Sequence, residues 1–246
     1  MLSCRVINSG SSGNSYLLTA SDGQVLIMEC GVKFKEIEQA LNFNLRNVVG
    51  TLCSHSHADH IRAAKDIVAA GITLHCLKAS AEAIGLDNHR VKHIEPNKQF
   101  EAGSFKIIGF PLRHDVPCLG FLIQHPDCGK IVFITDTSYV PQRFGKIQNY
   151  MIEANYCENI LRERSETGTI HEFLHDRVIR SHLSLQSCLG VLAANDLSET
   201  NNLLILHLSD SNSDAIRFQK EISEATGKRT TIAKPGVTLN FSKTPF

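Results

Sequence analysis

The sequence predicts mixed strands and helices of the α/β or α+β class, arranged as one domain over residues 1–246. Short runs rich in Val, Ile and Leu recur along the chain, and segments with a helical period lie between them. The 246 residues are 42% hydrophobic and 20% charged, which suffices for one full core, and no linker or internal repeat divides them. Grouped strands with interspersed helices indicate sheets covered by helices, and periodicity alone leaves the choice between the two classes open.

Each element is expected where its pattern is local and uninterrupted. In chain order, the apolar runs predict strands at residues 2–7, 16–18, 25–28, 48–52, 73–76, 105–110, 120–124, 130–135, 150–153, 203–207 and 237–241. Apolar residues spaced three and four apart predict helices between them, at residues 34–41, 60–70, 79–84, 185–195 and 214–226.

The composition disfavours several classes of protein. Lys and Arg total 25, as do Asp and Glu, so there is no global positive field to hold nucleic acid non-specifically. The eight Cys form no CxxC pair, which is typical of free, buried thiols in a cytosolic chain. No apolar run approaches the roughly 18 residues of a membrane span, and the start MLSCRVINSG lacks the pattern of a signal peptide. A cytoplasmic protein without a membrane partner is expected.

The most specific string is HSHADH, at residues 55–60. It follows an apolar strand and precedes a helical pattern, so its side chains lie on the turn between the two. His55 and His57 alternate and can converge on one cation, whereas Asp59 and His60, rotated by the helix start, can face a second. Imidazole and carboxylate ligands suit Zn²⁺, Mn²⁺ or Fe. The alternative, a solvated His-rich turn, is disfavoured because so many potential ligands stand so close together.

This string resembles the HxHxDH motif of the metallo-β-lactamase-fold hydrolases, and the rest of the chain follows the same family pattern. His114 in FPLRHDVP, Asp136 in FITDT and His207 in LLILHLSD each end an apolar run, in the order that the family shows. The resemblance covers essentially the whole chain. It implies an α/β fold of the αββα sandwich type, with a metal centre at one edge between the two sheets.

The resemblance also implies the ligands of two divalent metal ions, Zn or Mn. The expected ligands are, at the first position, His55, His57 and His114; at the second, Asp59, His60 and His207; and as a bridge, Asp136. Thiol-ester hydrolases and phosphodiesterases of the superfamily usually carry Asp at the bridging position, whereas many β-lactamases carry Cys. An antibiotic-degrading role is therefore disfavoured.

Two further residues point to phosphodiesters. Glu153 in MIEANY ends a strand, and His182 in SHLSL precedes a helix. They resemble the Glu and His of the tRNA 3′-processing nucleases, in which the carboxylate orients a histidine that acts on the leaving group, a suitable general acid at neutral pH. The expected catalytic residues are therefore Asp59, Glu153 and His182. Without this resemblance, Glu153 is an ordinary strand-end carboxylate and His182 a helix-entry histidine.

The string SGSSGNSY, at residues 9–16, places small residues between two strands, where hydroxyl and N–H groups can approach an anion. Ser11, Ser12 and Asn14 are the expected substrate contacts, and a plain Ser/Gly turn is the alternative. With HDVP, SHLS and HLSDSN, this string resembles the YycJ/WalJ group of exonuclease-like proteins. Phage anti-Pycsar phosphodiesterases, which open cyclic nucleotides, are a related group of similar size, and the motifs do not separate the two.

The chain departs from the family pattern at two places. Glu29 in LIMECG stands where the family usually has Asp, supporting a metal-binding histidine, so ligand geometry or metal preference is expected to differ. Residues 210–212 read Asp-Ser-Asn in place of an asparagine pair, which weakens the assignment to the exonuclease group.

HEFLH at residues 171–175 matches the HExxH motif of metalloproteases. Its charged flanks are typical of a solvated helix, and a complete metal set exists elsewhere.

Together these residues predict a dinuclear-metal phosphodiester hydrolase, a nuclease or exonuclease acting on DNA or RNA ends. Water activated between the metals attacks phosphorus, and His182 protonates the departing oxygen. Two alternatives stay open: a cyclic-nucleotide phosphodiesterase that degrades a signalling nucleotide in phage counter-defence, and a thiol-ester or lactone hydrolase on the same metal core. A non-catalytic binding protein is disfavoured because no expected ligand is missing. A homodimer is expected from the related phosphodiesterases.

Overall fold

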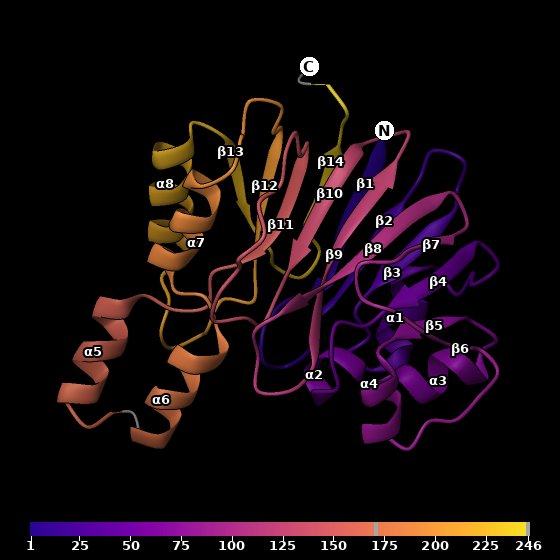
Figure 1. The fold of residues 1–246 in the computed structure, drawn as a ribbon, viewed down its shortest axis with the longest axis horizontal. Helices are drawn as coiled ribbons and strands as arrows, with labels where there is room; N and C mark the ends of the chain where they lie inside the picture. The colour runs from indigo at the N-terminus through magenta and orange to yellow at the C-terminus, as the bar shows by residue number, and fades with distance from the viewer. Residues whose placement is uncertain (170–171, 245–246) are drawn as a thin grey trace.

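The computed structural model, which describes residues 1–169 and 172–244, contains two seven-stranded sheets that face each other (Figure 1). Their strands are β1 (Leu2–Asn8), β2 (Ser15–Thr19), β3 (Val25–Met28), β4 (Val48–Leu52), β5 (Leu74–Cys76), β6 (Val91–His93), β7 (Gln99–Ala102), β8 (Phe105–Leu112), β9 (Cys118–His125), β10 (Gly129–Ile134), β11 (Asn149–Glu153), β12 (Asn202–Leu206), β13 (Arg229–Ile232) and β14 (Thr238–Phe241). The first sheet has the order β14-β1-β2-β3-β4-β5-β6, and the second has the order β13-β12-β11-β10-β9-β8-β7.

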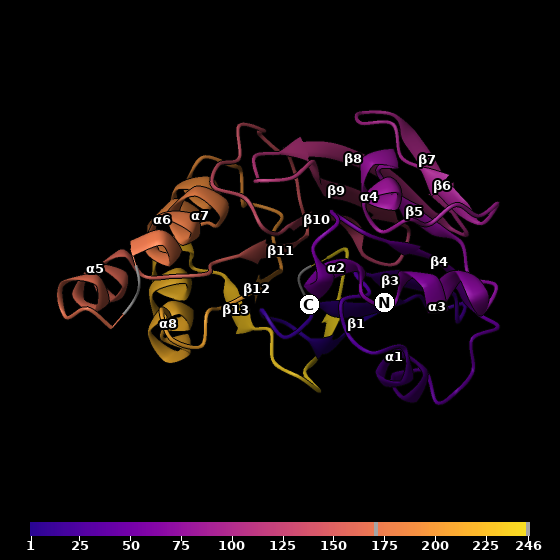
Figure 2. The ribbon, with the colours of Figure 1, turned by 90° about the horizontal axis from the view of Figure 1, so that it is seen from below.

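Helices flank the two sheets. They are α1 (Phe34–Ala40), α2 (Ala58–Ile61), α3 (Ala64–Ala69), α4 (Lys78–Ala83), α5 (Glu158–Glu166), α6 (Glu172–Ser181), α7 (Leu185–Ala193) and α8 (Ala215–Thr226). Seen from below, α1 and α3 lie beside the first sheet, and α7 and α8 lie beside the second (Figure 2). The helices α5 and α6 extend beyond the sheets at one end (Figure 1). In the described part of the chain, no helix combines the length and apolar character that crossing a membrane requires.

Alternating side chains build a core between the sheets and an apolar layer outside each of them. In β12, Leu204 and Leu206 belong to the core between the sheets, whereas Leu203 and Ile205 pack with residues of α7 and α8. The outer face of the first sheet packs in the same way against α1, α3 and α4. Central strands are therefore apolar on both faces, which explains why continuous apolar runs mark them in the sequence.

The strand directions bring the conspicuous polar residues together. β3, β4 and β5 pair in parallel, as do β10, β11, β12 and β13. β8 and β10 both pair antiparallel with β9, so these two also run in the same direction. Because the carboxyl ends of parallel strands lie at one edge of a sheet, the residues that follow them gather there.

The expected α/β class and αββα sandwich are confirmed, and every expected strand is present within two residues at each end. The single helix expected over residues 60–70 is wrong, since α2 and α3 replace it. The break comes where the N–H of Cys30 donates to the carbonyl of His60 at 2.9 Å and the N–H of Ala63 donates to the carbonyl of Cys30 at 2.8 Å. The backbone turns there to meet the segment after β3.

Three strands and two helices lie outside the predicted elements. β6, β7 and β13 are each an edge strand of three or four residues. Edge strands carry polar side chains, so a search for apolar runs does not find them. In α5, the only buried residue is Leu161, and the other side chains are mainly charged or polar, so its apolar period is weak. α6 was anticipated only as a solvated helix around HEFLH.

Candidate metal centre

The residues singled out in the sequence meet where strands of both sheets end. β4 leads into the turn at residues 55–60, and β8, β10 and β12 lead to His114, Asp136 and His207. Glu153 is the last residue of β11. The structure places all of the expected ligands in two groups that share Asp136.

The first group consists of His55, His57, His114 and Asp136, whose ligand atoms lie within 4.8 Å of one another. Nδ1 of His57 and Nε2 of His114 are 3.2 Å apart, and Nε2 of His55 lies 3.9 Å from Oδ2 of Asp136. Nitrogen ligands bound at about 2.0–2.1 Å to one tetrahedral ion are separated by roughly 3.3–3.4 Å. Nε2 of His55 is buried without a hydrogen-bond partner in the described residues, as expected of an atom that binds a cation.

The second group consists of Asp59, His60, His207 and the same Asp136. Oδ2 of Asp59 lies 3.4 Å from Nε2 of His60 and 3.4 Å from Nε2 of His207. Oδ1 of Asp136 lies 3.3 Å from Nε2 of His60. These separations also match neighbouring ligands of one ion. Since Oδ2 of Asp136 faces the first group and Oδ1 the second, the imidazole and carboxylate set fits divalent metal binding with Asp136 between the groups.

Partners on the outer ring nitrogens orient the histidines. Nδ1 of His114 donates to the carbonyl of Ser181 at 3.0 Å. A carbonyl oxygen only accepts, so that of Ser181 places the ring proton of His114 on Nδ1 and leaves its Nε2 lone pair for a cation. Nδ1 of His60 is buried and makes no hydrogen bond among the described residues, and its nearest carboxylate contact is Oε2 of Glu29 at 3.4 Å. Glu29 also accepts the N–H of Ser54 at 3.1 Å. The longer side chain at position 29 thus still reaches His60.

Buried carboxylates give the site a negative character. Although burial alone would lower it, the carboxylate of Asp136, with those of Asp59 and Glu153, raises the pKa of His207 to about 10. Asp136 likewise raises the pKa of His60 against the effect of burial. Burial also opposes the charge on Asp136, but His207 and His60 hold its pKa well below the usual range. The centre therefore attracts positive charge, which protons and divalent cations compete to supply.

His182 and Glu153 form a pair beside the two groups. Nδ1 of His182 lies 2.6 Å from Oε1 of Glu153, and the N–H of Leu183 donates to Oε2 at 3.1 Å. Glu153 is fully buried, yet contact with His182 lowers its pKa. Burial also acts against the charge on His182, but Glu153 raises its pKa. Glu153 and His182 also form, with Asp136 and His207, a third set of potential ligand atoms within 4.8 Å of one another.

A cavity of about 400 Å³ opens onto these residues. Metal-facing and acid–base side chains line it: His57, Asp59, His114, Asp136, His182 and His207. Helix α6 adds Leu174, Arg177 and Val178. Arg177 is exposed and has no carboxylate partner within residues 1–169 and 173–244. A helix that extends beyond the sheets thus brings a positive charge and apolar surface to the site.

Two residues that line this cavity, Arg177 and Asn155, and one beside its ligands, Asp115, were not singled out as site residues in the sequence. Arg177 is one of several arginines on charged helices. Asp115, next to a predicted ligand, lies 3.4 Å from Nε2 of His57. Asn155 donates to the carbonyl of His207 at 2.8 Å. Proximity in the chain to predicted ligands could have indicated Asp115 and Asn155, whereas Arg177 required the three-dimensional arrangement.

The expected substrate contacts occupy different places. Ser11 lines both the metal cavity and a neighbouring cavity, whereas Ser12 lines the neighbouring cavity alone. Asn14 is buried and lines neither of the two. Its side-chain amide donates to the carbonyls of Gly10 at 3.1 Å and Asp59 at 3.3 Å. Asn14 therefore supports the ligand-bearing turn, and a contact of Asn14 with substrate stays a prediction.

The segment after β3 lies directly against the ligand-bearing turn. A Cβ on Gly31 would lie 1.7 Å from the carbonyl oxygen of Asp59, so only glycine fits.

Three site residues that follow strands have left-handed backbone, Glu29 with φ of 61°, Asp136 with 42° and His207 with 54°. Each such conformation costs a non-glycine residue about 1–3 kcal/mol and is typical of functional sites.

The HEFLH string and the 210–212 segment differ in their relation to the metal cavity. His171 of HEFLH lies outside the described residues, and His175 belongs to no group of potential metal ligands in the part that the structure describes. In the 210–212 segment, Asn212 is buried, accepts from Nη1 of Arg164 at 2.6 Å and lines the metal cavity. The departure from an asparagine pair therefore retains an amide at the site.

Known proteins resemble this chain in sequence and in fold. A family model described as a Beta-lactamase superfamily domain matches residues 29–204. The exodeoxyribonuclease WalJ of Streptococcus pneumoniae is 29% identical over 224 residues, which cover 84% of this chain and 81% of that protein. The exodeoxyribonuclease YycJ of Bacillus anthracis is 26% identical over 219 residues, which cover 83% of this chain and 81% of that protein.

Solved structures share the architecture at low sequence identity. The metallo-β-lactamase fold protein YhfI from Bacillus subtilis aligns with a TM-score of 0.75 at 17% identity, covering 97% of this chain and 98% of its own. The short form of human tRNase Z aligns with a TM-score of 0.65 at 14% identity, covering 97% and 99%. These similarities confirm the metallo-β-lactamase fold.

Proposed function

From the premise that the chain belongs to the β-lactamase superfamily, as a metal-dependent hydrolase, we propose that it cleaves phosphodiester bonds at the ends of nucleic acid strands, DNA foremost. The proposal rests on the 2.6 Å contact between Nδ1 of His182 and Oε1 of Glu153 at the metal cavity. A phosphodiester releases an alkoxide, which departs readily only when it is protonated, and an oriented histidine supplies that proton. A thiolate leaving group has no such need. Two relatives that bear the name exodeoxyribonuclease support the same choice.

The two groups around Asp136 would hold two divalent cations, Zn or Mn, one with His55, His57 and His114, the other with Asp59, His60 and His207. When bound, such cations lower the pKa of water and withdraw charge from phosphate oxygens. Glu153 accepts from Nδ1 of His182 and stabilises the charged ring, which leaves Nε2 to protonate the departing oxygen. The side chain of Arg177 supplies a guanidinium for the phosphate, and Ser11 supplies a hydroxyl.

The test is turnover by Mn²⁺-loaded protein of a matched panel: 5′-labelled single-stranded DNA, 3′,5′-cyclic nucleotides and a thiol ester. A His57→Ala sample serves as the blank for contaminating nuclease. Progressive shortening of the DNA is expected in the wild-type sample alone. Linear monophosphate from the cyclic compounds with intact DNA would replace this proposal by a small-molecule phosphodiesterase. Thiol-ester turnover that survives His182→Ala, with intact DNA, would replace the proposal by a thiol-ester or lactone hydrolase. The cytoplasmic location and the homodimer stay predictions.

A further inference from the structure

A second cavity, of about 460 Å³, lies next to the metal cavity. Ser11, Leu208 and Ser209 line both cavities. Leu208 and Ser209 directly follow the expected ligand His207, and Ser11 lies in the Ser/Gly string. The two spaces therefore adjoin along one ridge, and a substrate that reaches the metal ligands can continue into the second space.

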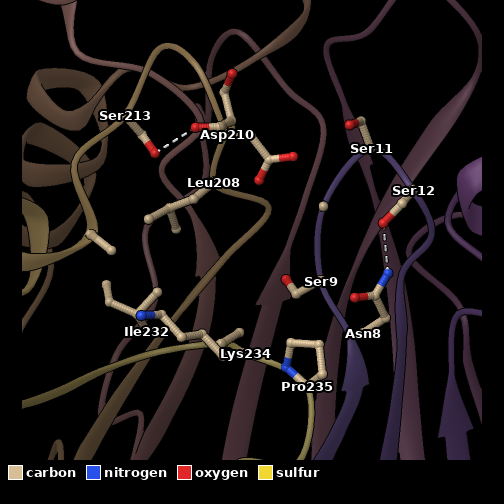
Figure 3. Close-up of a pocket in the computed structure, with 14 residues that line it drawn as sticks. Asn8, Ser9, Ser11, Ser12, Leu208, Asp210, Ser213, Ile232, Lys234 and Pro235 are labelled. Carbon is tan, nitrogen blue, oxygen red and sulfur yellow. Dashed lines mark hydrogen bonds between the residues drawn. The ribbon is translucent and has the colours of Figure 1, made fainter.

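The walls of the second cavity differ in chemistry (Figure 3). The loop of Ser11 and Ser12 forms one wall, and the segment of Asp210 and Ser213 forms another. Between them run the residues after β13, among them Lys234. Small residues in the first wall let a ligand approach the backbone closely. The cavity is thus open and polar, with apolar surface from Leu208, Ile232 and Pro235.

Lys234 is the one positively charged residue among those that line this cavity. It is exposed, and within residues 1–169 and 173–244 it has no carboxylate partner. Arg177, which lines the metal cavity, is likewise exposed and has no carboxylate partner among the described side chains. Lys234 and Arg177 have no ion-pair partner among the side chains that the structure describes, and two such positive charges in adjoining cavities fit a ligand with two successive phosphates. A cyclic mononucleotide carries one phosphate and would leave one of these cations without a partner.

We infer that the second cavity binds the nucleotide adjacent to the scissile phosphodiester of a single-stranded polynucleotide, with Lys234 contacting that nucleotide's phosphate. Asp210 accepts hydrogen bonds from its sugar or base, since a carboxylate only accepts at neutral pH. The volume falls within the roughly 300–1,000 Å³ that small-ligand sites occupy. This inference rests on the proposed function and adds the position of the polynucleotide on the molecule.

The experiment compares two phosphodiesters on the Mn²⁺-loaded 246-residue chain. One is a single-stranded oligodeoxynucleotide, and the other is bis(p-nitrophenyl) phosphate, which has only one phosphate. The variants are Lys234→Ala, Lys234→Arg and Lys106→Ala. Lys106 is an exposed lysine on β8, remote from both cavities, and serves as the matched control. Each kcat/KM is measured from low to moderate salt.

In Lys234→Ala, the ratio of oligonucleotide to ester kcat/KM is expected to fall about tenfold, and Lys234→Arg to restore most of it. The slope of log kcat/KM against log salt for the oligonucleotide is expected to flatten by about 0.7, one phosphate contact on a single strand. Lys106→Ala is expected to match wild type. An unchanged ratio and slope in Lys234→Ala overturns the inference while leaving the proposed function intact. Wild-type protein that cleaves the ester but no oligonucleotide overturns both.

Discussion

Oε1 of Glu153 lies 2.6 Å from Nδ1 of His182 and 3.1 Å from Nδ1 of His207. One buried carboxylate oxygen thus orients both the histidine expected to donate a proton and a histidine expected to bind a cation. Because Nδ1 is committed in both rings, each presents Nε2 elsewhere. Proton donation by His182 and cation binding by His207 are therefore coupled through Glu153. A substitution of His182 tests proton donation alone, whereas a substitution of Glu153 affects both.

His182→Ala should lower kcat for DNA by about 10²–10⁴, the usual contribution of a general acid. The loss should be much smaller for bis(p-nitrophenyl) phosphate, because p-nitrophenolate departs without a proton. Kinetics on both substrates, with metal content from elemental analysis, check this expectation. His175→Ala, on α6 and outside every group of described ligands, is the control. Equal losses on the two substrates would show that His182 does not act as the acid.

Arg177→Ala should lower kcat/KM for DNA by roughly tenfold or more, because a charge-assisted contact to phosphate contributes about 1.5–3 kcal/mol. Arg180→Ala, on the same helix but outside the cavity lining, should leave it unchanged. Steady-state kinetics of the two variants at one salt concentration make the comparison. If both variants lose activity equally, the effect comes from the general field of α6 and not from a contact at the site.

Removing divalent cations should lower the thermal stability as well as the activity. A ligand at 100 times its Kd stabilises the folded state by about 2.7 kcal/mol. For a chain of this size, that gain raises Tm by roughly 5–10 °C. Thermal unfolding of chelator-treated protein, with and without added Mn²⁺, measures the shift. Asp136→Asn should lose most of it, and an equal shift in that variant would place the cation elsewhere.

Gly31→Ala should cost at least about 3 kcal/mol of unfolding free energy and weaken cation binding. The added Cβ would lie 1.7 Å from the backbone oxygen of Asp59, so the ligand-bearing turn has to move. Gly190→Ala is the matched control, since its Cβ meets nothing within 4 Å on α7. That substitution should stabilise the chain by about 0.5–1 kcal/mol. Urea unfolding of both variants tests the pair, and similar values would contradict the close approach.

His75 should make the fold sensitive to mild acid. Burial, with a smaller effect of Lys92, lowers its pKa from 6.5 to about 4, and its ring stacks on Phe100 at 5.0 Å. A histidine with a lowered folded-state pKa stabilises the fold fully above its unfolded pKa of about 6.5, and that stability is lost as pH falls towards 4. Between pH 7 and 4.5, wild type should lose about 2 kcal/mol more unfolding free energy than His75→Gln. Parallel pH dependence in urea titrations would refute this.

The sequence allowed the central strands and the metal-facing residues to be predicted because both leave local signals. Strands covered on both faces read as apolar runs, and His55 to His60 stand within one turn. Other features depend on contacts between distant segments. The contact of Lys234 with the second cavity and the position of Arg177 at the metal cavity come from segments far apart in the chain. The break between α2 and α3 arises from hydrogen bonds to Cys30, which no periodicity reports.

The left-handed backbone at Glu29, Asp136 and His207 has a consequence for the engineering of this protein. Glycine at any of the three positions would relieve local strain while removing a side chain that the chemistry needs. A laboratory selection for heat resistance alone would therefore reward variants that discard the site. Catalytic turnover and thermal stability have to be screened together, because at these three positions a substitution that raises stability lowers activity.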